Sequence, residues 1–432
     1  MQYRKILSLL SFLGAILLAI GITASPAIQS IGVALIFAGA LPLIFFEKPK
    51  FNLFAILLLL YFLIHLLAGF YTINKEGYWK DLRMKLPFLL IPIGFYFQNT
   101  ISNKRKIYVL FIFTITIFLV GTMTFCHYLL HLNYYNERIF QSKPIDIISF
   151  KEFFMLISGK TLPIDNGGNI IGLDHIYFSF MLAFSAWAAF YLLRTGFFVK
   201  RFAKWVLMTI GACMIIYLHT IAARTGLLAF YAAGGIVVLY IIFIMRKVAA
   251  GIGIFLAVAA LGAISILFIP SLHNRFLNTQ EDIGAYHNQE IMKNYSISPR
   301  IEALKTAYSV FKKSPVIGVS RGDIDTAMRQ QYILQKSSLS PDNFILPHNQ
   351  FVFELVASGL VGLIILLAIF IYPVIIKNTR LNLLFMLFLV ICFFSFQAEY
   401  GLERQAGVSF FTLFYMLFSF RDVDLMSPTP EN

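Results

Sequence analysis

The chain has 432 residues, of which 59% are hydrophobic and 13% are charged, and its formal net charge is +14. A soluble domain carries about 25% charged residues, so the composition excludes a set of soluble domains, a disordered chain and a collagen-like chain. Long apolar runs such as 54–67 and 360–376 recur from one end to the other. They predict a single integral membrane domain over residues 1–432. All three cysteines lie inside apolar runs and give no information about redox compartment.

Transmembrane helices need about 20 predominantly apolar residues, and twelve stretches meet that criterion. They are 6–24, 27–46, 51–72, 84–98, 107–130, 171–193, 205–221, 226–245, 248–270, 350–376, 381–397 and 407–420. Stretch 84–98 is the weakest of them, because it is short and is interrupted by Pro87 and Pro92. Stretch 6–24 follows two basic residues as a secretory signal would, but a second apolar run comes directly after it, which favours an uncleaved span. The predicted fold is all-α and polytopic, with about twelve spans.

Basic residues indicate which ends of these spans face the cytoplasm. With the N-terminus inside, the short cytoplasmic segments hold 16 of the 35 basic residues and four of the 21 acidic residues. The net charge is then +12 on that side and +2 in the rest of the chain. Basic residues retained in short loops orient helical membrane proteins, so the charge reports topology and requires no nucleic-acid partner.

Two segments on the opposite side, 131–170 and 271–349, are too long to be turns. Connections longer than about 12–15 residues usually carry function or are disordered, so we expect the chemistry on this outer face. Within the second segment, Ser298 suits a helix N-cap and Pro299 the first helical position. Ile301, Leu304, Tyr308 and Phe311 then share one face of an amphipathic helix, which is expected to lie on the membrane surface or to pack on the spans.

Two arginines are candidate anion ligands. Arg224 lies between two spans at the outer end, and Arg300 lies in the first turn of the predicted amphipathic helix, where free backbone N–H groups already favour an anion. A guanidinium group binds phosphate through a rigid pair of donors. The alternatives are that Arg224 reaches to the lipid headgroups and that Arg300 is a solvated residue at a helix start.

His348 and Asn349 mark the point where the long outer segment enters the tenth span. Gly359 and Gly362 continue along the same predicted helical face and would allow close helix packing. A neutral histidine held at the membrane boundary can accept a proton from a hydroxyl group. The alternative is a histidine that only caps the helix. Glu354, inside this span, is costly unless it is paired.

Further polar residues gather at the outer ends of other spans. The last outer connection contains Glu399, Glu403, Arg404 and Gln405, which are expected to be mostly salt-bridged structural residues, with Arg404 a possible partner of Glu354. Tyr177 follows Asp174 and His175 at the start of the sixth span, where interfacial anchoring is the favoured role.

The sequence contains no complete motif for a metal or nucleotide site. His127 and His131 share a helical face but make only half a site, without the glutamate of a His-Glu-x-x-His motif. Glycine-rich phosphate loops and a Gly-x-Ser-x-Gly elbow are both absent from the sequence. We therefore expect no metal, no cofactor and no ATP hydrolysis.

Taken together, these residues resemble the O-antigen ligase and polymerase superfamily. The similarity lies in Ala-Ala-Arg224-Thr-Gly between two spans, Pro-Arg300-Ile-Glu in the long outer segment, and Pro-His348-Asn349-Gln-Phe-x7-Gly359-x-x-Gly362. Glu399 and Glu403-Arg404-Gln are a looser match to the polar end segment of some members. The resemblance covers the whole chain in topology and residues 215–365 in sequence.

The resemblance implies a metal-independent, inverting glycosyltransferase of the bacterial inner membrane, with its active face in the periplasm. The donor would be a glycan linked to undecaprenyl diphosphate. His348 would act as catalytic base, Arg224 and Arg300 would bind the diphosphate, and Asn349, Glu403, Arg404 and Tyr177 would support the site.

The acceptor is open within the family. Lipid A–core would make the protein an O-antigen ligase of lipopolysaccharide biosynthesis, another repeat unit a polymerase, and a protein hydroxyl an O-oligosaccharyltransferase. The ligase is favoured because its His-Asn pattern is the clearer match. A twelve-span secondary transporter fits the composition equally well, but transporters bind substrate near the bilayer centre and often have related halves. A non-catalytic flippase partner or scaffold is a third alternative.

Overall fold

The computed structural model describes residues 2–44, 52–96, 102–130, 175–198, 200–221, 223–268, 298–380 and 382–419. Every regular element in these ranges is a helix. Eight of the described helices are long and apolar enough to cross a membrane, and three shorter apolar helices accompany them. The all-α, multi-pass prediction is therefore confirmed at that level. The predicted outer loop 131–170 lies outside the described residues, as does 271–297 of the second loop.

A described helix overlaps each of the twelve predicted spans. These helices are α1 (Gln2–Ala24), α2 (Pro26–Ile44), α3 (Leu53–Leu67), α5 (Pro87–Tyr96), α6 (Asn103–Leu130), α9 (His175–Arg194), α10 (Arg201–Ile221), α11 (Arg224–Leu239), α12 (Val248–Phe268), α16 (Gln350–Ile375), α18 (Leu383–Ala398) and α19 (Gln405–Ser419). The weakest predicted span, 84–98, corresponds to α5, which has ten residues and contains Pro92. The count of twelve membrane crossings stays a prediction.

Shorter elements connect these helices. They are η1 (Ala68–Phe70), α4 (Lys75–Lys85), a π-helical turn (Tyr240–Ile244) that continues α11, α14 (Ser298–Phe311), α15 (Ile324–Leu334), η3 (Pro341–Asn343) and α17 (Lys377–Arg380). Several helices begin at an asparagine whose side-chain oxygen accepts from a free backbone N–H of the first turn. Asn52 does so for Ala55 and Asn382 for Phe385.

The chain divides into two compact units. Among the described residues, the first takes in 2–22, 26–106 and 298–419, and the second 23–25 and 107–268. His348 and Arg300 thus belong to the first unit, whereas Arg224 and Tyr177 belong to the second.

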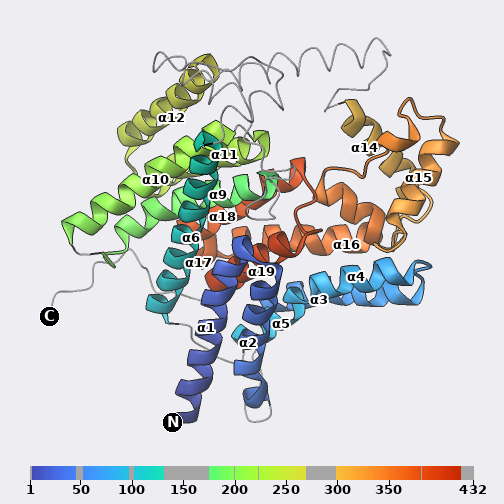
Figure 1. The fold of residues 1–432 in the computed structure, drawn as a ribbon, viewed down its shortest axis with the longest axis horizontal. Coiled ribbons are helices and arrows are strands. Elements are labelled where there is room, and N and C mark those ends of the chain that lie inside the picture. Colours follow the sequence, from blue (N-terminus) through green and yellow to red (C-terminus); the bar gives the residue numbers. More distant parts are fainter. Residues whose placement is uncertain are drawn as a thin grey trace. The chain divides into compact units, whose positions relative to one another are not determined.

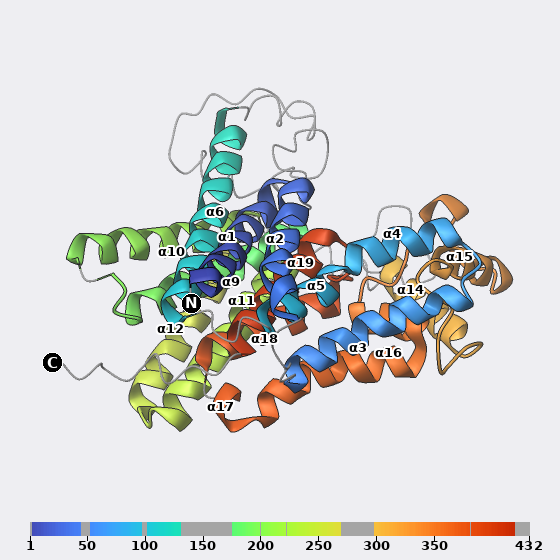
Figure 2. The same ribbon diagram turned by 90° about the horizontal axis from the view of Figure 1, so that it is seen from below.

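The first unit is built around α3, which lies alongside α16 (Figure 2) and also packs on α5. Aromatic rings fill the space between these helices: the Phe54 ring lies 4.7 Å from that of Tyr372, and the Tyr61 ring lies 5.0 Å from that of Phe88. Ring pairs at such distances add stabilisation beyond the burial of their area. Helices far apart in sequence are thereby held together.

Helix α14 has the predicted bounds, but the face that packs is a different one. Ala303, Ala307 and Val310 are buried against the first half of α16, whereas Leu304 is 38% exposed and Tyr308 is 55% exposed. Packing on a predicted span, one of the two expected placements, is therefore observed, but of the predicted face Phe311 packs against this core while Leu304 and Tyr308 are exposed. Small side chains allow two helix backbones to approach closely. The alanines therefore form the face of α14 that packs on α16.

Helix α16 is interrupted at Gly359, whose φ of 66° and ψ of −160° are non-helical. The segment 315–320 fills the break. Val319 N–H and Ser320 N–H donate to the carbonyl oxygens of Val356 and Ala357 at 2.9 Å, and Leu360 N–H donates to Pro315 O at 2.9 Å. Gly359 therefore does not serve the helix packing that the sequence suggested. It ends one helical segment, so that residues 315–320 can pair with the backbone groups left free at the break.

The second unit is organised around α9, which packs on α10 and α11 (Figure 1). Almost every side chain of α9 is buried, including Tyr177. The Trp187 ring stacks on Phe230 of α11 at 5.2 Å, and its indole N–H donates to the Phe230 carbonyl. Gly226 of α11 faces Ser179, and an added Cβ there would come within 2.6 Å of the serine side chain. This contact fixes the first turns of α11 against α9.

Candidate functional site

The site is built at the start of α16. Asn349 is the N-cap residue: its side-chain oxygen accepts from the N–H groups of Phe351 and Val352 at 3.0 and 3.1 Å. Its amide nitrogen donates to the backbone and side-chain oxygens of Gln397, at the end of α18. The predicted supporting residue Asn349 therefore joins two helices. His348 precedes this cap and is thus outside the helix, so its position is set by the cap and not by the helical face that the sequence predicted.

His348 is paired with a carboxylate. Its Nδ1 lies 3.0 Å from an oxygen of Glu399, at the C-terminal end of α18. The Glu399 side chain is buried and that of His348 is about one-fifth exposed. A proton on Nδ1 that is donated to the carboxylate leaves the lone pair on Nε2. The arrangement is that of a general base whose tautomer and orientation are fixed by an acid.

An aromatic wall stands beside His348. The Tyr400 ring lies 5.0 Å from the imidazole, and Phe353 lies 5.5 Å from Tyr400. The guanidinium carbon of Arg321 lies 5.1 Å from the Phe353 ring. Burial, and after it the Glu399 carboxylate, raises the pKa of Tyr400 to about 12. The phenol is therefore neutral at physiological pH.

The turn that carries Glu399 is fixed by Glu403. One carboxylate oxygen of Glu403 lies 2.8 Å from Lys85 Nζ, and the other accepts from Arg321 Nε at 2.7 Å. Next to it, Leu402 N–H donates to the buried Gln350 side chain at 2.7 Å, and Lys85 donates to the Leu402 carbonyl. The expectation that Glu403 is a salt-bridged residue is confirmed. Its partners come from α4 and from the segment before α15.

The same ion pairs continue into the membrane-spanning helices. Lys85 Nζ lies 3.2 Å from Asp81, whose other carboxylate oxygen is 3.4 Å from His65 Nδ1 of α3. On its opposite edge, His65 Nε2 lies 3.5 Å from Glu354, which also accepts from the Tyr61 hydroxyl at 2.7 Å. We call His65, Asp81, Lys85, Glu354, Glu403 and Arg321 the buried ion network.

Glu354 is 0% exposed, and its partners are Tyr61 and His65. The suggested pairing with Arg404 was wrong, because the Glu354 side chain lies against α3, which carries Tyr61 and His65. Gly362 makes room for the carboxylate: an added Cβ would come 2.5 Å from Glu354 Oε1. The second glycine of the motif therefore accommodates a buried acid.

The charges of the network stabilise one another. Burial alone would raise the pKa of Asp81, but the neighbouring Lys85 and His65 hold it below its usual value. Burial would likewise lower the pKa of Lys85, and the carboxylates of Asp81 and Glu403 raise it instead. The pKa of Arg321 is raised by Glu403 against the effect of its own burial. These groups are therefore charged at neutral pH, as buried ions can be only when they are paired.

Arg300 lies in the first turn of α14 and is half-buried. Helix α14 packs against the first half of α16. Arg300 and His348 are therefore carried by elements that share one core. Nearby, Glu302 accepts from Gln335 and Ser337, which ties α14 to the end of α15.

The other predicted site residues are differently placed. Arg224 is the exposed first residue of α11, after Ala223 as N-cap. Tyr177 is buried and packs on Phe180 within α9. Arg404 is exposed beside the buried Glu403. Hydrogen bonds and ion pairs link the segments that carry His348, Asn349 and Glu403. Convergence of Arg224 and Tyr177 on His348 stays a prediction.

Sequence reasoning did not single out four members of the buried ion network: His65, Asp81, Lys85 and Arg321. A signal was available in α4, where Asp81 and Lys85 are four residues apart in a polar helix between apolar runs. His65 is the basic residue in the otherwise apolar α3. Arg321 has a local partner in Asp325, four residues later, but nothing near it in the sequence points to Glu403, which is 82 residues away.

No group of three or more histidine, cysteine, aspartate or glutamate side chains that could hold a metal ion occurs in the part of the chain that the structure describes. His131 lies outside that part. The sequence comparisons give one family: residues 209–367 match the model described as O-Antigen ligase. No curated protein matches the chain. The matched segment contains the α11 arginine, the arginine of α14, the histidine before α16 and both motif glycines.

Proposed function

Because residues 209–367 match the O-Antigen ligase family model, we propose that the chain transfers a glycan from undecaprenyl diphosphate to an acceptor hydroxyl group. The proposal takes the reaction to the periplasmic face of the bacterial inner membrane. The observation that carries it is the pairing of His348 with Glu399 at the start of a membrane-spanning helix. This family has lipid-linked glycans and acceptors as substrates.

In the proposed reaction, Nε2 of His348 takes the proton of the acceptor hydroxyl as its oxygen attacks the anomeric carbon. The bond from that carbon to the diphosphate oxygen breaks, the electron pair leaves with the diphosphate, and the configuration inverts. Glu399 stabilises the imidazolium that forms while keeping Nδ1–H directed at the carboxylate. A positioned base of this kind contributes about 10²–10⁴-fold in rate.

Arg300 and Arg224 are the proposed ligands of the diphosphate. Negative charge accumulates on the leaving group in the transition state, and preorganised cations stabilise it there. Each charge-assisted hydrogen bond contributes about 1.5–3 kcal/mol. The position of both arginines in the first turn of a helix supports this role, because the free N–H groups of that turn favour the same anion.

Among acceptors, we favour lipid A–core, which would make the reaction O-antigen ligation. The His348-Asn349 pair, with Asn349 capping α16 and bound to Gln397, fits a rigidly held base. Transfer to another repeat unit or to a protein hydroxyl uses the same base and leaving group, so the acceptor assay below separates the three.

The decisive experiment supplies the purified chain with an undecaprenyl-diphosphate-linked glycan and with each class of acceptor, and identifies products by mass spectrometry. His348→Ala and Arg300→Ala should abolish transfer while leaving expression and membrane insertion intact. Lys313→Ala, a change of an exposed cation just after α14, is the control and should transfer normally. Wild-type turnover by His348→Ala would remove the catalytic assignment. Substrate-dependent uptake into proteoliposomes without a covalent product would favour a transporter.

A further inference from the structure

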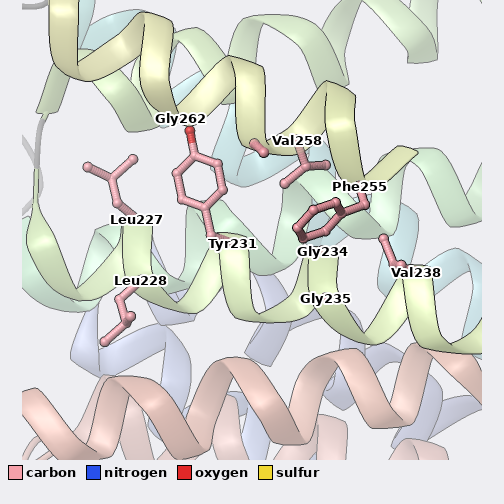
Figure 3. Close-up of a pocket in the computed structure, with 10 residues that line it drawn as sticks. Leu227, Leu228, Tyr231, Gly234, Gly235, Val238, Phe255, Val258 and Gly262 are labelled. Atoms are coloured by element: carbon pink, nitrogen blue, oxygen red, sulfur yellow. The ribbon is translucent and has the colours of Figure 1, made fainter. Parts of the chain in front are cut away.

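The second unit contains an apolar groove between α11 and α12 that the reaction described above does not use (Figure 3). Its volume is about 450 Å³, within the range of small-molecule sites. In Figure 3 the Tyr231 ring rises from α11 towards Gly262 of α12, and the Phe255 ring lies over Gly234. We call this feature the α11–α12 groove; its lining residues are Leu227, Leu228, Tyr231, Gly234, Gly235, Val238, Phe255, Val258, Ala259 and Gly262.

The groove is hollow because glycines replace side chains along it. An added Cβ at Gly235 would meet nothing within 4 Å, and one at Gly262 would just touch the Tyr231 ring at 3.5 Å. The Tyr231 hydroxyl, the polar side-chain group of the lining, lies 2.8 Å from His219 Nε2. The remaining lining is hydrocarbon, so a ligand of the groove must itself be apolar.

The α11 lining residues follow helical spacing, and Arg224 begins their series. From Arg224, the steps of three and four lead to Leu227, Leu228 and Tyr231, and then to the two glycines and Val238. Arg224 therefore lies on the face of α11 that lines the groove, one turn before its first member. From Leu227 to Val238 the helix rises about 16 Å at about 1.5 Å per residue. A ligand with an anionic head at Arg224 can extend a hydrocarbon chain along this face.

We propose that the α11–α12 groove binds the first isoprene units of the polyprenyl chain of the donor, with the diphosphate at Arg224. This inference rests on the proposed function, because it takes the donor from there. Arg224 then has two tasks, to bind the leaving group and to set the register of the lipid. The methyl branches of an isoprenoid fit the open space beside Gly235, where an added Cβ would meet nothing within 4 Å, whereas a straight acyl chain has no branch to fill it.

The test measures binding of undecaprenyl diphosphate, without any glycan, to the purified full chain by native mass spectrometry. In Gly235→Leu the new side chain occupies the space that the lipid chain would fill. The lipid then loses apolar contact area of about one leucine side chain, which should weaken its binding about tenfold or more. Gly253→Leu is the matched control: Gly253 is a glycine of α12 with nothing within 4 Å of an added Cβ, and it does not line the groove. It should bind the lipid as the wild type does.

A second pair of variants keeps the test valid if Gly235→Leu fails to fold. Ala259→Leu narrows the groove from α12, whereas Ala257→Leu changes an exposed alanine of the same helix outside the lining. Inorganic diphosphate, which has no lipid chain, should bind the wild type and Gly235→Leu equally, and Arg224→Gln should weaken both probes.

Two results would overturn the groove assignment, and a third would separate it from the proposed function. Undecaprenyl diphosphate bound equally by the wild type, Gly235→Leu and Ala259→Leu overturns the groove. Equimolar phosphatidylglycerol that displaces the probe also overturns it, because the groove is then an ordinary acyl-chain site. If the wild type forms no glycan product while the predicted binding pattern holds, the groove assignment stands and the transferase proposal falls.

Discussion

His348 and Glu399 are 51 residues apart in the chain and pair at 3.0 Å between Nδ1 and a carboxylate oxygen. The pair links the residue before the N-cap of α16 to the residue after α18. In a transferase, this contact fixes which imidazole nitrogen accepts the proton, so its effect should appear in the rate of the chemical step and not in donor binding.

Glu399→Gln should therefore lower kcat of glycan transfer by about 10²–10⁴-fold, with little change in the KM of the donor. The amide keeps the shape of the side chain but can present its N–H₂ to Nδ1 and favour the wrong tautomer. Steady-state kinetics with purified protein measure the effect. Glu76→Gln, a change of an exposed carboxylate in α4, is the control. A kcat of wild-type size in Glu399→Gln would show that the carboxylate has no catalytic role.

Lys85→Met should destabilise the protein by about 3–5 kcal/mol, because it leaves Asp81 and Glu403 buried without their shared cation. The Lys85 side chain is 0% exposed and touches both carboxylates. Apparent Tm in detergent, followed by intrinsic fluorescence, reports the loss. Lys80→Met alters an exposed lysine of the same helix and should leave Tm almost unchanged. Equal Tm values for the two variants would contradict a stabilising network.

Gly359→Ala should reduce stability by about 1–3 kcal/mol, since its φ of 66° with ψ of −160° is a conformation that essentially only glycine adopts. The new Cβ would also lie 2.3 Å from the backbone of Val316. The same thermal measurement applies, with Gly253→Ala as the matched control in open space. If both alanine variants melt like the wild type, the break in α16 is not a structural requirement.

The stability of the first unit should depend on pH through Asp81 and Lys85. The pKa of Asp81 is lowered in the folded state, so its contribution is complete above its unfolded value of about 3.9 and is lost as the pH falls through the folded value. The pKa of Lys85 is raised, so its contribution is complete below about 10.4 and is lost as the pH rises through the folded value.

Apparent Tm should therefore be nearly constant between about pH 5 and pH 10. Asp81→Asn should lower this plateau and make the acid side of the curve shallower, since one titrating carboxylate has been removed. Asp342→Asn, which changes an exposed residue of η3, should reproduce the wild-type curve. An unchanged acid limb in Asp81→Asn would assign the pH dependence to other groups.

Glycan transfer should persist in excess EDTA, because two arginines are proposed to meet the charge of the diphosphate. The measurement is the initial rate before and after removal of divalent ions by chelation. A rate that falls with EDTA and returns with added Mg²⁺ or Mn²⁺ would contradict the arginine-based account. It would also make His127 and His131 candidates again.

The sequence predicted the helices well because hydropathy is a local property. Any stretch of about 20 apolar residues must satisfy its backbone hydrogen bonds internally in a membrane, so each of the twelve stretches overlaps a helix. The start of α14 was equally local, since Ser298 and Pro299 favour the first turn wherever the helix packs. The family resemblance, which rested on short motifs around Arg224, Arg300 and His348, is confirmed by the match over residues 209–367.

Tertiary structure alone decided which polar residues meet. Glu354 had to have a partner, but only the packing of α3 on α16 made that partner His65 and not Arg404. The same holds for Glu399 with His348 and for Glu403 with Lys85 and Arg321. Ion pairs act over a few ångströms between side chains that lie far apart in the chain. Their partners are therefore set by the way the helices pack, which local sequence patterns do not predict.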